Sequence, residues 1–455
     1  MIMIIRIVLS LLYYGMINVD YMKNLKQFIL TGYIILYPVY LCAMNLSVEN
    51  PGSFNPVVSG ARANGLAGAF IGLSNDATAC ATNPGGLIQL LRPETSVVYN
   101  LLVRSEDFTF GKYPGTANNI SITEQNLNFL SFSYPFEWIN RNWVFSIAYQ
   151  HLYTFDREWF FDIHNYGPIF VNHDRYKYKQ KGQLSALGFS FCAQLTPDLS
   201  FGATLNFWDQ HLANNGWEQR YQVNGIMLVD DNQYLTSYRQ TQIFYFNGFN
   251  MNFGLLWDIS GYLNEKPGIF KVGMVYKTPF TAELTHIIRF SQNDIYTNGE
   301  LEMPLSFGIG MVYNVNPYLS VTTDIYYTNW HRFIIRDSSG TEMSPVTGQN
   351  FSESDTSDTF HLRIGTEYLL HTSKPYAVPL RFGIFYDPAP ADKNPDDFYG
   401  FAFGTGITRE GKFSLDAAYQ YRKGKNVGES FLKQHDFYEN IDEHSFTISV
   451  ILYIE

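Results

Sequence analysis

Charged side chains are scarce in this chain of 455 residues. Asp, Glu, Lys and Arg together make up 16% of it, whereas about a quarter is usual for globular proteins. So few charges cannot cover the water-exposed surface of a soluble protein of this length. No linker, charge block or low-complexity tract divides the sequence, so we expect one large structural unit.

Long apolar runs are also missing. After the N-terminal region no uninterrupted apolar stretch reaches the roughly 18 residues of a transmembrane helix, and the mean hydropathy of -0.14 excludes a bundle of such helices. Aromatic residues, by contrast, make up 17% of the chain, with 37 Phe and 33 Tyr. This composition is typical of a membrane β-barrel, because half of each strand faces lipid and half faces a polar lumen.

Basic residues and cysteines are few. The formal net charge of -11 leaves no basic stripe to neutralise phosphates, so nucleic acid is not an expected partner. Cys42, Cys80 and Cys192 form no CxxC pair and lack metal-ligand spacing, so we predict neither metal nor cofactor. A bridge between Cys80 and Cys192 remains open, although two unreactive small residues are favoured.

Residues 1–43 have the order of a signal peptide. A basic start at residues 22–26 precedes an apolar stretch at residues 28–41, which predicts export and cleavage near Ala43. Residues 1–21 are then an upstream extension.

Two alternatives for this region are weaker. A membrane-anchoring helix is disfavoured by Pro38 and by the shortness of the apolar run. A lipoprotein site at Cys42 is disfavoured because Leu41 occupies a position where such sites need a small residue.

A segment rich in small residues, Gly60 to Leu87, precedes all the strands. Its Ala and Gly side chains allow short helices and turns to pack tightly, and Asn83-Pro84-Gly85-Gly86 is strong turn chemistry. Period-two alternation begins near Glu94. We therefore predict a plug at residues 60–92, within an N-terminal segment of residues 44–92, followed by a barrel of residues 93–455.

Short and long connections then alternate along the chain, and the long polar stretches lie near 105–124, 156–182, 213–237, 278–303, 333–358, 388–397 and 424–442. Short turns on one rim and long polar loops on the other are typical of a bacterial outer-membrane barrel. The alternation predicts an all-β fold, an antiparallel barrel of about fourteen strands, with both termini at the short-turn, periplasmic rim. Residues 283–290 are assigned to a loop because another strand would break the even count. The predicted strands are 94–104, 125–138, 142–155, 183–195, 199–212, 238–257, 269–277, 304–314, 318–332, 359–370, 379–387, 398–409, 412–423 and 443–454.

Alternation within the strands separates two faces. In residues 446–454, for example, Phe446 and Ile448 alternate with Thr447 and Ser449, and successive side chains of a strand point to opposite sides. A soluble sandwich would alternate in the same way with its apolar face inward. The signal peptide, the unequal loops and the Tyr and Trp residues at strand ends favour apolar side chains facing lipid.

On this assignment the charges within strands face the lumen. Asp324, Arg363 and Arg381 lie on three consecutive predicted strands, with Glu367 beside them, and could form a ladder that braces the wall or grips the plug. This structural role is favoured over a ligand site. The full set comprises Lys271, Lys277, Asp324, Arg363, Glu367, Arg381, Asp387, Asp416 and Arg422.

Catalytic motifs are absent from the sequence. It has no Gly-x-Ser-x-Gly and no His-Glu-x-x-His, so we predict no enzyme and no catalytic residues. An outer-wall phospholipase using His151 or His331 is conceivable, but isolated His residues at strand ends are usually interfacial. The acidic stretch 337–358 could bind calcium weakly, although a solvated outer loop is favoured.

Several motifs together resemble one family. Asn83-Pro84-Gly85 resembles the Asn-Pro-Ala motif in the hatch of the outer-membrane long-chain fatty acid transporter family. Residues 272–280, 324–330, 361–368 and 379–388 are similar, in order, to later strands of that family. The chain departs from the family pattern at Gly85, and at its terminal Glu455, where an aromatic residue is typical.

The resemblance implies passive uptake of hydrophobic compounds, most often long-chain fatty acids, across the outer membrane of a double-membraned bacterium. It implies a monomer surrounded by outer-membrane lipid, with an apolar pocket gated by the hatch. The gating residues would be Asn83, Pro84, Gly85 and Gly86. Candidates for the pocket floor are Leu66, Phe70, Ile71 and Leu87, for which simple packing against the barrel is an equal alternative.

Two other functions stay open. Related hatch-bearing barrels serve as accessory proteins in protein secretion to the cell surface, and residues 60–87 resemble that branch too. A surface adhesin or a purely structural porin is the third possibility, since a fold does not determine a function.

Overall fold

The computed structural model describes residues 58–454 except 117, 167–170, 214, 230–231, 290–293, 372–374 and 431–435. The predicted signal peptide, the start of the N-terminal segment and Cys42 therefore lie outside the described residues. Among the helices described, none is long and apolar enough to cross a bilayer.

Fourteen strands pair in a closed antiparallel ring, as the sequence predicts. The last strand, β20 (Phe437–Tyr453), returns to the first, β1 (Glu94–Phe110), with Glu94 opposite Tyr453. The ring therefore has no free edge at the level of these pairings. In ring order its other members are β2 (Asn118–Trp138), β3 (Arg141–Thr154), β5 (Val171–Gln194), β6 (Leu199–Trp208), β8 (Asn232–Asp258), β9 (Phe270–Lys277), β12 (Ser306–Asn316), β13 (Leu319–Thr328), β16 (Thr359–His371), β17 (Tyr376–Tyr386), β18 (Phe398–Arg409) and β19 (Phe413–Val427).

The outer face of this ring is apolar and the inner face is polar. On β20, Phe446 and Ile448 are 47% and 52% exposed, whereas their neighbours Thr447 and Ser449 are 2% and 4% exposed. An exterior of Phe, Leu, Ile and Tyr is suited to lipid rather than to water. The predicted facing of the strands is confirmed, and the soluble sandwich is excluded.

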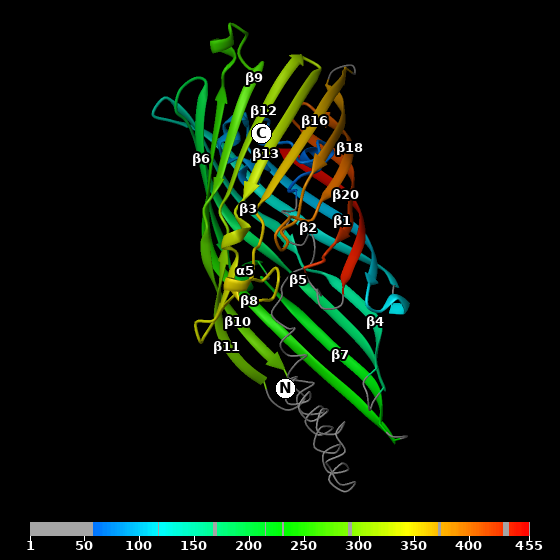
Figure 1. Ribbon diagram of the computed structural model, residues 1–455. Helices are drawn as coiled ribbons and strands as arrows, with labels where there is room; N and C mark the ends of the chain where they lie inside the picture. The colour runs from blue at the N-terminus through cyan, green and yellow to red at the C-terminus, as the bar shows by residue number, and fades with distance from the viewer. Residues whose placement is uncertain are drawn as a thin grey trace, which may run out of the picture. The chain divides into compact units, whose positions relative to one another are not determined.

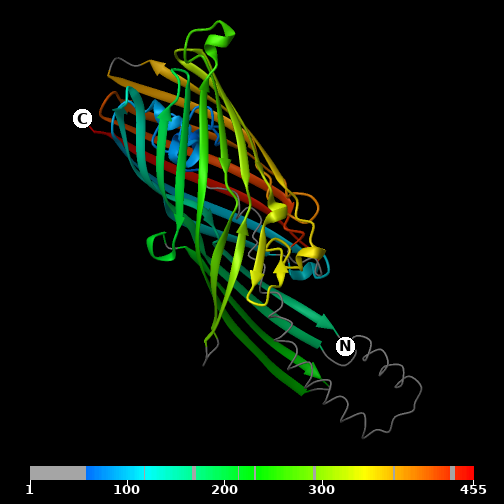
Figure 2. The ribbon, with the colours of Figure 1, turned by 90° about the vertical axis from the view of Figure 1, so that its left-hand side faces the viewer.

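Several strands run far beyond the length needed to cross a membrane. Strand β8 has 27 residues, whereas about 9–11 residues suffice. Further strands lie beside it and extend the ring strands past the rim that carries the long loops (Figures 1 and 2). These are β4 (Arg157–Tyr166), β7 (Gly216–Val229), β10 (Phe280–Arg289), β11 (Asp294–Met303) and β14 (Ile334–Asp337), with the short β15 (Glu342–Met343) paired to β14.

The prediction of long loops at 156–182, 213–237 and 278–303 was therefore largely wrong, whereas 333–358 contains, as strands, only the short β14 and β15 and is otherwise mostly irregular. Strands β3 and β4 both pair with β5, and β9 and β10 both pair with β8, so each pair is one strand interrupted by a short break. Residues 283–290 fall mostly in β10, and the even count survives because β10 continues β9. These segments are rich in charged and polar residues, so their sequence does not show the apolar alternation of a strand. Pairing with neighbouring strands stabilises them as strands nevertheless.

An aromatic cluster gathers beside these breaks. Trp208, Trp217 and Phe244 are almost fully buried in it, and Trp217 stacks on Phe244 with 4.7 Å between ring centroids. We call β4, β7, β10, β11, β14 and β15 the outer extension. Apolar burial of this extent holds the outer extension against the ring.

Three short helices precede β1: α3 (Ala61–Gly65), α4 (Ala79–Thr82) and the 3-10 helix η1 (Pro84–Gln89). We call residues 58–93 the plug. Its helices lie among the barrel strands near the C-terminal end of β20 (Figures 1 and 2). Nearly every plug residue from Ser59 to Leu87 is buried. The predicted filling of the barrel by residues 60–92 agrees with this placement.

Candidate functional site

The plug follows the inner wall of the barrel around most of the ring. Helix α3 begins against β20, where the Ala61 amide donates to Ser449 Oγ at 2.6 Å and Asn64 Nδ2 donates to Thr447 Oγ1 at 2.8 Å. Helix η1 ends on the opposite side, against β3, β5, β6, β8 and β9. Contacts on both sides of the lumen fix the position of the plug.

Asp324 on β13 holds the middle of the plug. One oxygen of its carboxylate accepts hydrogen bonds from the backbone amides of Phe70 and Ile71, at 2.6 and 2.9 Å. Asp324 is 2% exposed, and charge-assisted hydrogen bonds of this kind are about twice as strong as neutral ones. This residue of the predicted ladder therefore binds plug backbone.

Asn83 joins the turn of the plug to the wall. Its side-chain oxygen accepts from the Gly85 amide at 3.1 Å and caps η1, where Pro84 occupies the first helical position. Its amide nitrogen donates to the carbonyls of Ile71 and of Leu255 on β8, at 2.9 and 3.0 Å. A single side chain thus holds two parts of the plug and one strand together.

Glycines on the wall make this close contact possible. We call seven lumen-facing glycines the glycine belt, because a Cβ added at any of them would lie 2.2 to 2.9 Å from a plug atom; Gly308 is left out because its nearest neighbour is Tyr326 of the wall. Gly202 and Gly254 are cross-strand partners, as are Gly273 and Gly310. The belt comprises Gly202, Gly254, Gly273, Gly310, Gly365, Gly383 and Gly404.

The belt also explains the departure at Gly85. A Cβ there would lie 2.9 Å from backbone atoms of Gly254, which is closer than carbon atoms pack. Alanine at this position would push η1 away from β8, so glycine fits where the family motif has alanine.

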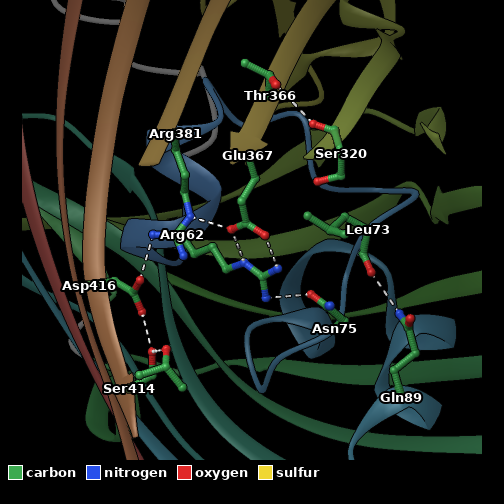
Figure 3. A network of polar contacts seen from close by, with 11 residues as sticks. Arg62, Leu73, Asn75, Gln89, Ser320, Thr366, Glu367, Arg381, Ser414 and Asp416 are labelled. Carbon is green, nitrogen blue, oxygen red and sulfur yellow. Dashed lines mark hydrogen bonds and ion pairs between the residues drawn. The ribbon is translucent and has the colours of Figure 1, made fainter. Parts of the chain in front are cut away.

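Four charged side chains clamp α3 to the wall (Figure 3). Arg62 of α3 pairs with Glu367 at 2.8 Å, Glu367 pairs with Arg381 at 2.6 Å, and Arg381 pairs with Asp416 at 2.6 Å. Burial alone would lower the pKa of Arg62, but the Glu367 carboxylate outweighs it and raises the pKa above its usual value. Arg62 therefore stays charged, and we call these four residues the plug clamp.

The predicted ladder is thus divided between several contacts. Glu367 and Arg381 belong to the plug clamp, and Asp324 binds plug amides. Arg363 pairs instead with Asp387 at 2.7 Å. Sequence reasoning missed Arg62 as the partner from the plug, although it is the sole charged residue in residues 60–75.

The four candidate pocket residues separate into two pairs. Phe70 and Ile71 line a cavity of about 70 Å³ between plug and wall. Leu87 packs in a buried cluster with Val98 and Phe129 of the barrel, and Leu66 packs beside Val312. The first pair borders open space, although Phe70 also belongs to the buried cluster of Leu66 and Val312, and the second pair packs the plug against the wall.

The 70 Å³ cavity has an apolar side and a charged side. Phe70, Ile71, Leu152 and Val275 form the apolar side, and Lys277 is on the charged side. No carboxylate among the described residues lies within ion-pair distance of Lys277, whose ammonium lies 5.6 Å from the Tyr326 ring centroid. Asp324, Tyr326 and Arg363 complete the charged side.

A second charged group lies farther out, where the sequence predicted loops. Arg157 is completely buried, 2.6 Å from Glu439 and 3.4 Å from Glu106, and its guanidinium covers the Trp159 ring at 4.3 Å. Glu439 and Glu443 face inward and continue the alternation of β20 beyond its predicted start. This alternation is the sequence signal from which the second charged group could have been predicted.

One arrangement resembles a catalytic triad in its distances. His361 lies 3.0 Å from Asp387 through Nδ1 and 3.1 Å from the Thr359 hydroxyl through Nε2. Thr359 is completely buried and also accepts from Trp330 Nε1, so no substrate reaches it in this conformation. Within the part of the chain that the structure describes, no group of three or more His, Cys, Asp or Glu side chains could hold a metal.

Cys80 and Cys192 are free thiols and are buried at 0% and 1% exposure. We expect Cys80, in a Cys42→Ser, Cys192→Ser background, to resist a membrane-impermeant maleimide while the plug is docked. Unfolding in denaturant should expose it to complete labelling. Rapid labelling of the native protein would contradict the buried position of α4.

Comparison with known proteins concerns the fold. No family model matches the chain, and no curated protein sequence matches it. Solved structures do. A FadL homologue from Pseudomonas aeruginosa superposes with a TM-score of 0.61 at 12% identity, covering 89% of this chain and 100% of that one. The Pseudomonas putida toluene transporter TodX gives 0.51 at 13% identity, covering 88% and 100%.

At these identities the likeness establishes the fold. The chain has the barrel fold of these FadL-like proteins, and the resemblance found in the sequence is confirmed at that level.

Proposed function

We propose that the protein is an outer-membrane transporter, not an enzyme, that takes up hydrophobic small molecules passively past a movable plug. The observation that carries this proposal is the cavity between Phe70, Ile71 and the wall. It places apolar surface at the junction of plug and barrel, inside a polar lumen, where a hydrophobic ligand would be held before release. TodX, named as a toluene transporter, shares the fold.

The size of the cavity supports a gate. Its volume of about 70 Å³ is half of the roughly 150 Å³ in which a protein cavity binds benzene. A ligand of benzene size or larger would enter only as the plug moves. Asn83, Pro84, Gly85 and Gly86 are the proposed hinge, because they connect η1 to both the wall and the rest of the plug.

Long-chain fatty acids are the favoured ligands. Lys277 provides a positive charge without a carboxylate partner among the described residues, beside the apolar side of the cavity. A carboxylate at Lys277 with its chain against Phe70 and Ile71 would match that arrangement.

We expect Lys277→Met to separate fatty acids from hydrocarbons. Uptake of radiolabelled oleate by cells whose own transporter is deleted should fall about tenfold, which is the effect of losing one partly buried ion pair of about 1.4 kcal/mol. Toluene uptake should not change. Lys266→Met, in a short periplasmic turn, is the matched control, and equal loss of both substrates would contradict a carboxylate site at Lys277.

The hinge is tested by Asn83→Ala combined with Pro84→Ala. Losing the cap and the two hydrogen bonds to backbone carbonyls should reduce oleate uptake several-fold while the barrel stays resistant to heat in detergent. Initial uptake rates and heat-dependent gel mobility measure the two effects. Unchanged uptake would remove the plug from the transport mechanism.

A further inference from the structure

A second cavity, of about 120 Å³, lies on the outer side of the plug. It adjoins the cavity described above, because Val58 lines both. We call it the polar chamber, since 14 of its 16 lining residues are polar or charged; most of them belong to α3, β1, β2, β3, β19 and β20. It is lined by Val58, Asn64, Asn100, Leu102, Arg104, Glu124, Asn126, Asn128, His151, Thr154, Asp387, Gln420, Arg422, Glu443, Ser445 and Thr447.

Both arginines of the polar chamber are already paired. Arg104 Nε donates to Glu443 at 2.9 Å, and Arg422 Nη1 donates to the other oxygen of Glu443 at 2.8 Å. The Arg422 guanidinium also lies over the Phe398 ring at 3.7 Å. Glu443 therefore offsets part of their charge, and Arg422 Nε is the buried nitrogen of this pair without a hydrogen-bond partner.

Glu124 on β2 differs from these residues. It is 5% exposed, and neither of its carboxylate oxygens has a hydrogen bond of good geometry, with the Thr154 hydroxyl and Arg104 as its polar neighbours. A buried carboxylate is normally satisfied by donors. Glu124 therefore presents unused acceptor capacity within the chamber.

The plug contributes a second unused acceptor. Asn64 Nδ2 donates to Thr447, while Asn64 Oδ1 has no hydrogen-bond partner and is buried. Of the three carboxylates in the lining, Asp387 pairs with Arg363, and Glu443 pairs with both Arg104 and Arg422, so among the described residues Glu124 is the one without an ion pair. A group that donates hydrogen bonds is complementary to it, and a carboxylate is not.

We propose that the polar chamber is a second ligand site, which binds the amine or hydroxyl end of an amphipathic molecule through Glu124 and Asn64. This inference rests on the proposed uptake of hydrophobic molecules and adds a substrate class to it, because the chamber favours donor-bearing amphiphiles rather than fatty acids. Leu102 and Val58 contact the first carbons of the ligand, and Val58 leads to the apolar cavity. Contact with Asn64 places the ligand against α3, so its binding reports directly on the plug.

The test uses hexylamine, hexanol, hexanoate and hexane with the full-length mature protein in lipid nanodiscs at pH 7.5. Binding is measured by calorimetry with empty nanodiscs subtracted. In the Lys277→Met protein, which lacks the proposed carboxylate contact, we expect hexylamine and hexanol to bind at least tenfold more tightly than hexanoate. Glu124→Gln should abolish the preference for hexylamine over hexanoate, and Asn64→Ala should weaken hexanol binding.

Glu94→Gln is the matched control. Glu94 is a lumen carboxylate, 4% exposed and with one unpartnered oxygen, that lies at the periplasmic end of β1 outside the chamber. This variant should keep the amine preference.

Two results would overturn the inference. One is equal binding of hexanoate and hexylamine. The other is an amine preference that survives Glu124→Gln, because the amine would then bind outside the chamber and the chamber would hold water only. If hexane binds while the polar compounds show no preference, the second site fails and the proposed uptake stands. If amine binding follows Glu124 while neither hexane nor oleate is bound or taken up, the chamber stands and the uptake proposal fails.

Discussion

Replacing Gly254 with valine is expected to displace the plug from an intact barrel. A Cβ at this position would lie 2.2 Å from Asn83 Oδ1, 2.6 Å from Pro84 Cδ and 2.7 Å from the Gly85 amide nitrogen. The last two atoms belong to a rigid ring and to backbone, so they yield only if η1 moves. Overpacking of this kind costs about 1–3 kcal/mol, which raises the open population roughly fivefold to 150-fold.

Single-channel conductance in planar bilayers measures this opening directly. In cells the same variant should become sensitive to vancomycin, which an occluded barrel excludes. Labelling of Cys80 by the impermeant maleimide should rise in parallel. Strands favour β-branched residues, so the barrel itself should keep its heat-dependent gel mobility.

Gly261→Val is the control for Gly254→Val. A Cβ at Gly261 meets no atom within 4 Å, so the same change in volume should leave conductance and labelling unaltered. If Gly254→Val stays closed and Cys80 stays protected, the glycine belt does not determine plug docking.

Glu367→Gln is expected to loosen the plug through charge rather than volume. The neutral side chain leaves Arg62 and Arg381 facing each other with only Asp416 remaining in the plug clamp. Removing one partner from a buried ion pair costs about 3–5 kcal/mol. The Arg62 side chain is 21% exposed in the docked state and gains more water when α3 leaves the wall, so the cost falls mainly on the docked state.

The expected result is frequent opening in conductance traces and faster labelling of Cys80. Adding Arg62→Met should restore closure in part, because the stranded charge is removed. The matched control is Glu302→Gln, which breaks a 2.9 Å pair with Arg336 at 30% exposure. Exposed pairs contribute about 0–1 kcal/mol, so this variant should resemble the wild type. A Glu367→Gln protein that opens no more often than the control would show that hydrogen bonds and packing hold the plug without the clamp.

The two experiments address different stages of one proposed motion. Gly254 lies against Asn83 and η1, whereas Glu367 holds α3 on the far side of the lumen. If each variant opens the channel alone, the plug leaves as one body. Gly254→Val could also expose Cys80 while Arg62 stays paired. In that case Arg62→Met should have the same effect on conductance with and without Gly254→Val, and we would conclude that η1 moves while α3 stays docked.

The outer extension carries ion pairs between neighbouring strands, which could not be predicted while these residues were assigned to loops. Glu158 pairs with Lys179 at 2.9 Å, and Arg175 pairs with Asp162 at 3.0 Å, across β4 and β5. These exposed charges suit water rather than lipid, which is consistent with strands that continue past the membrane. The aromatic cluster at their base then connects the extension to the ring.

The sequence by itself determined the class of fold, the fourteen strands, the lipid-facing and lumen-facing sides and the plug. These follow from local rules: alternation of period two sets the face of each strand residue, and small residues with Asn-Pro-Gly-Gly set a compact turn. Phe446, Ile448, Thr447 and Ser449 could each be placed without knowing any neighbour.

The tertiary structure alone decided which residues meet across the lumen. Arg62 and Glu367 are 305 positions apart, and their pairing depends on strand registers and on the path of the plug, neither of which local periodicity encodes. The contact between Gly254 and Asn83 depends on the same two factors. So does the position of Glu124, whose carboxylate oxygens have no hydrogen bond of good geometry. The outer strands were missed for a related reason, because β4 and β7 are stabilised by pairing with β5 rather than by an apolar pattern of their own.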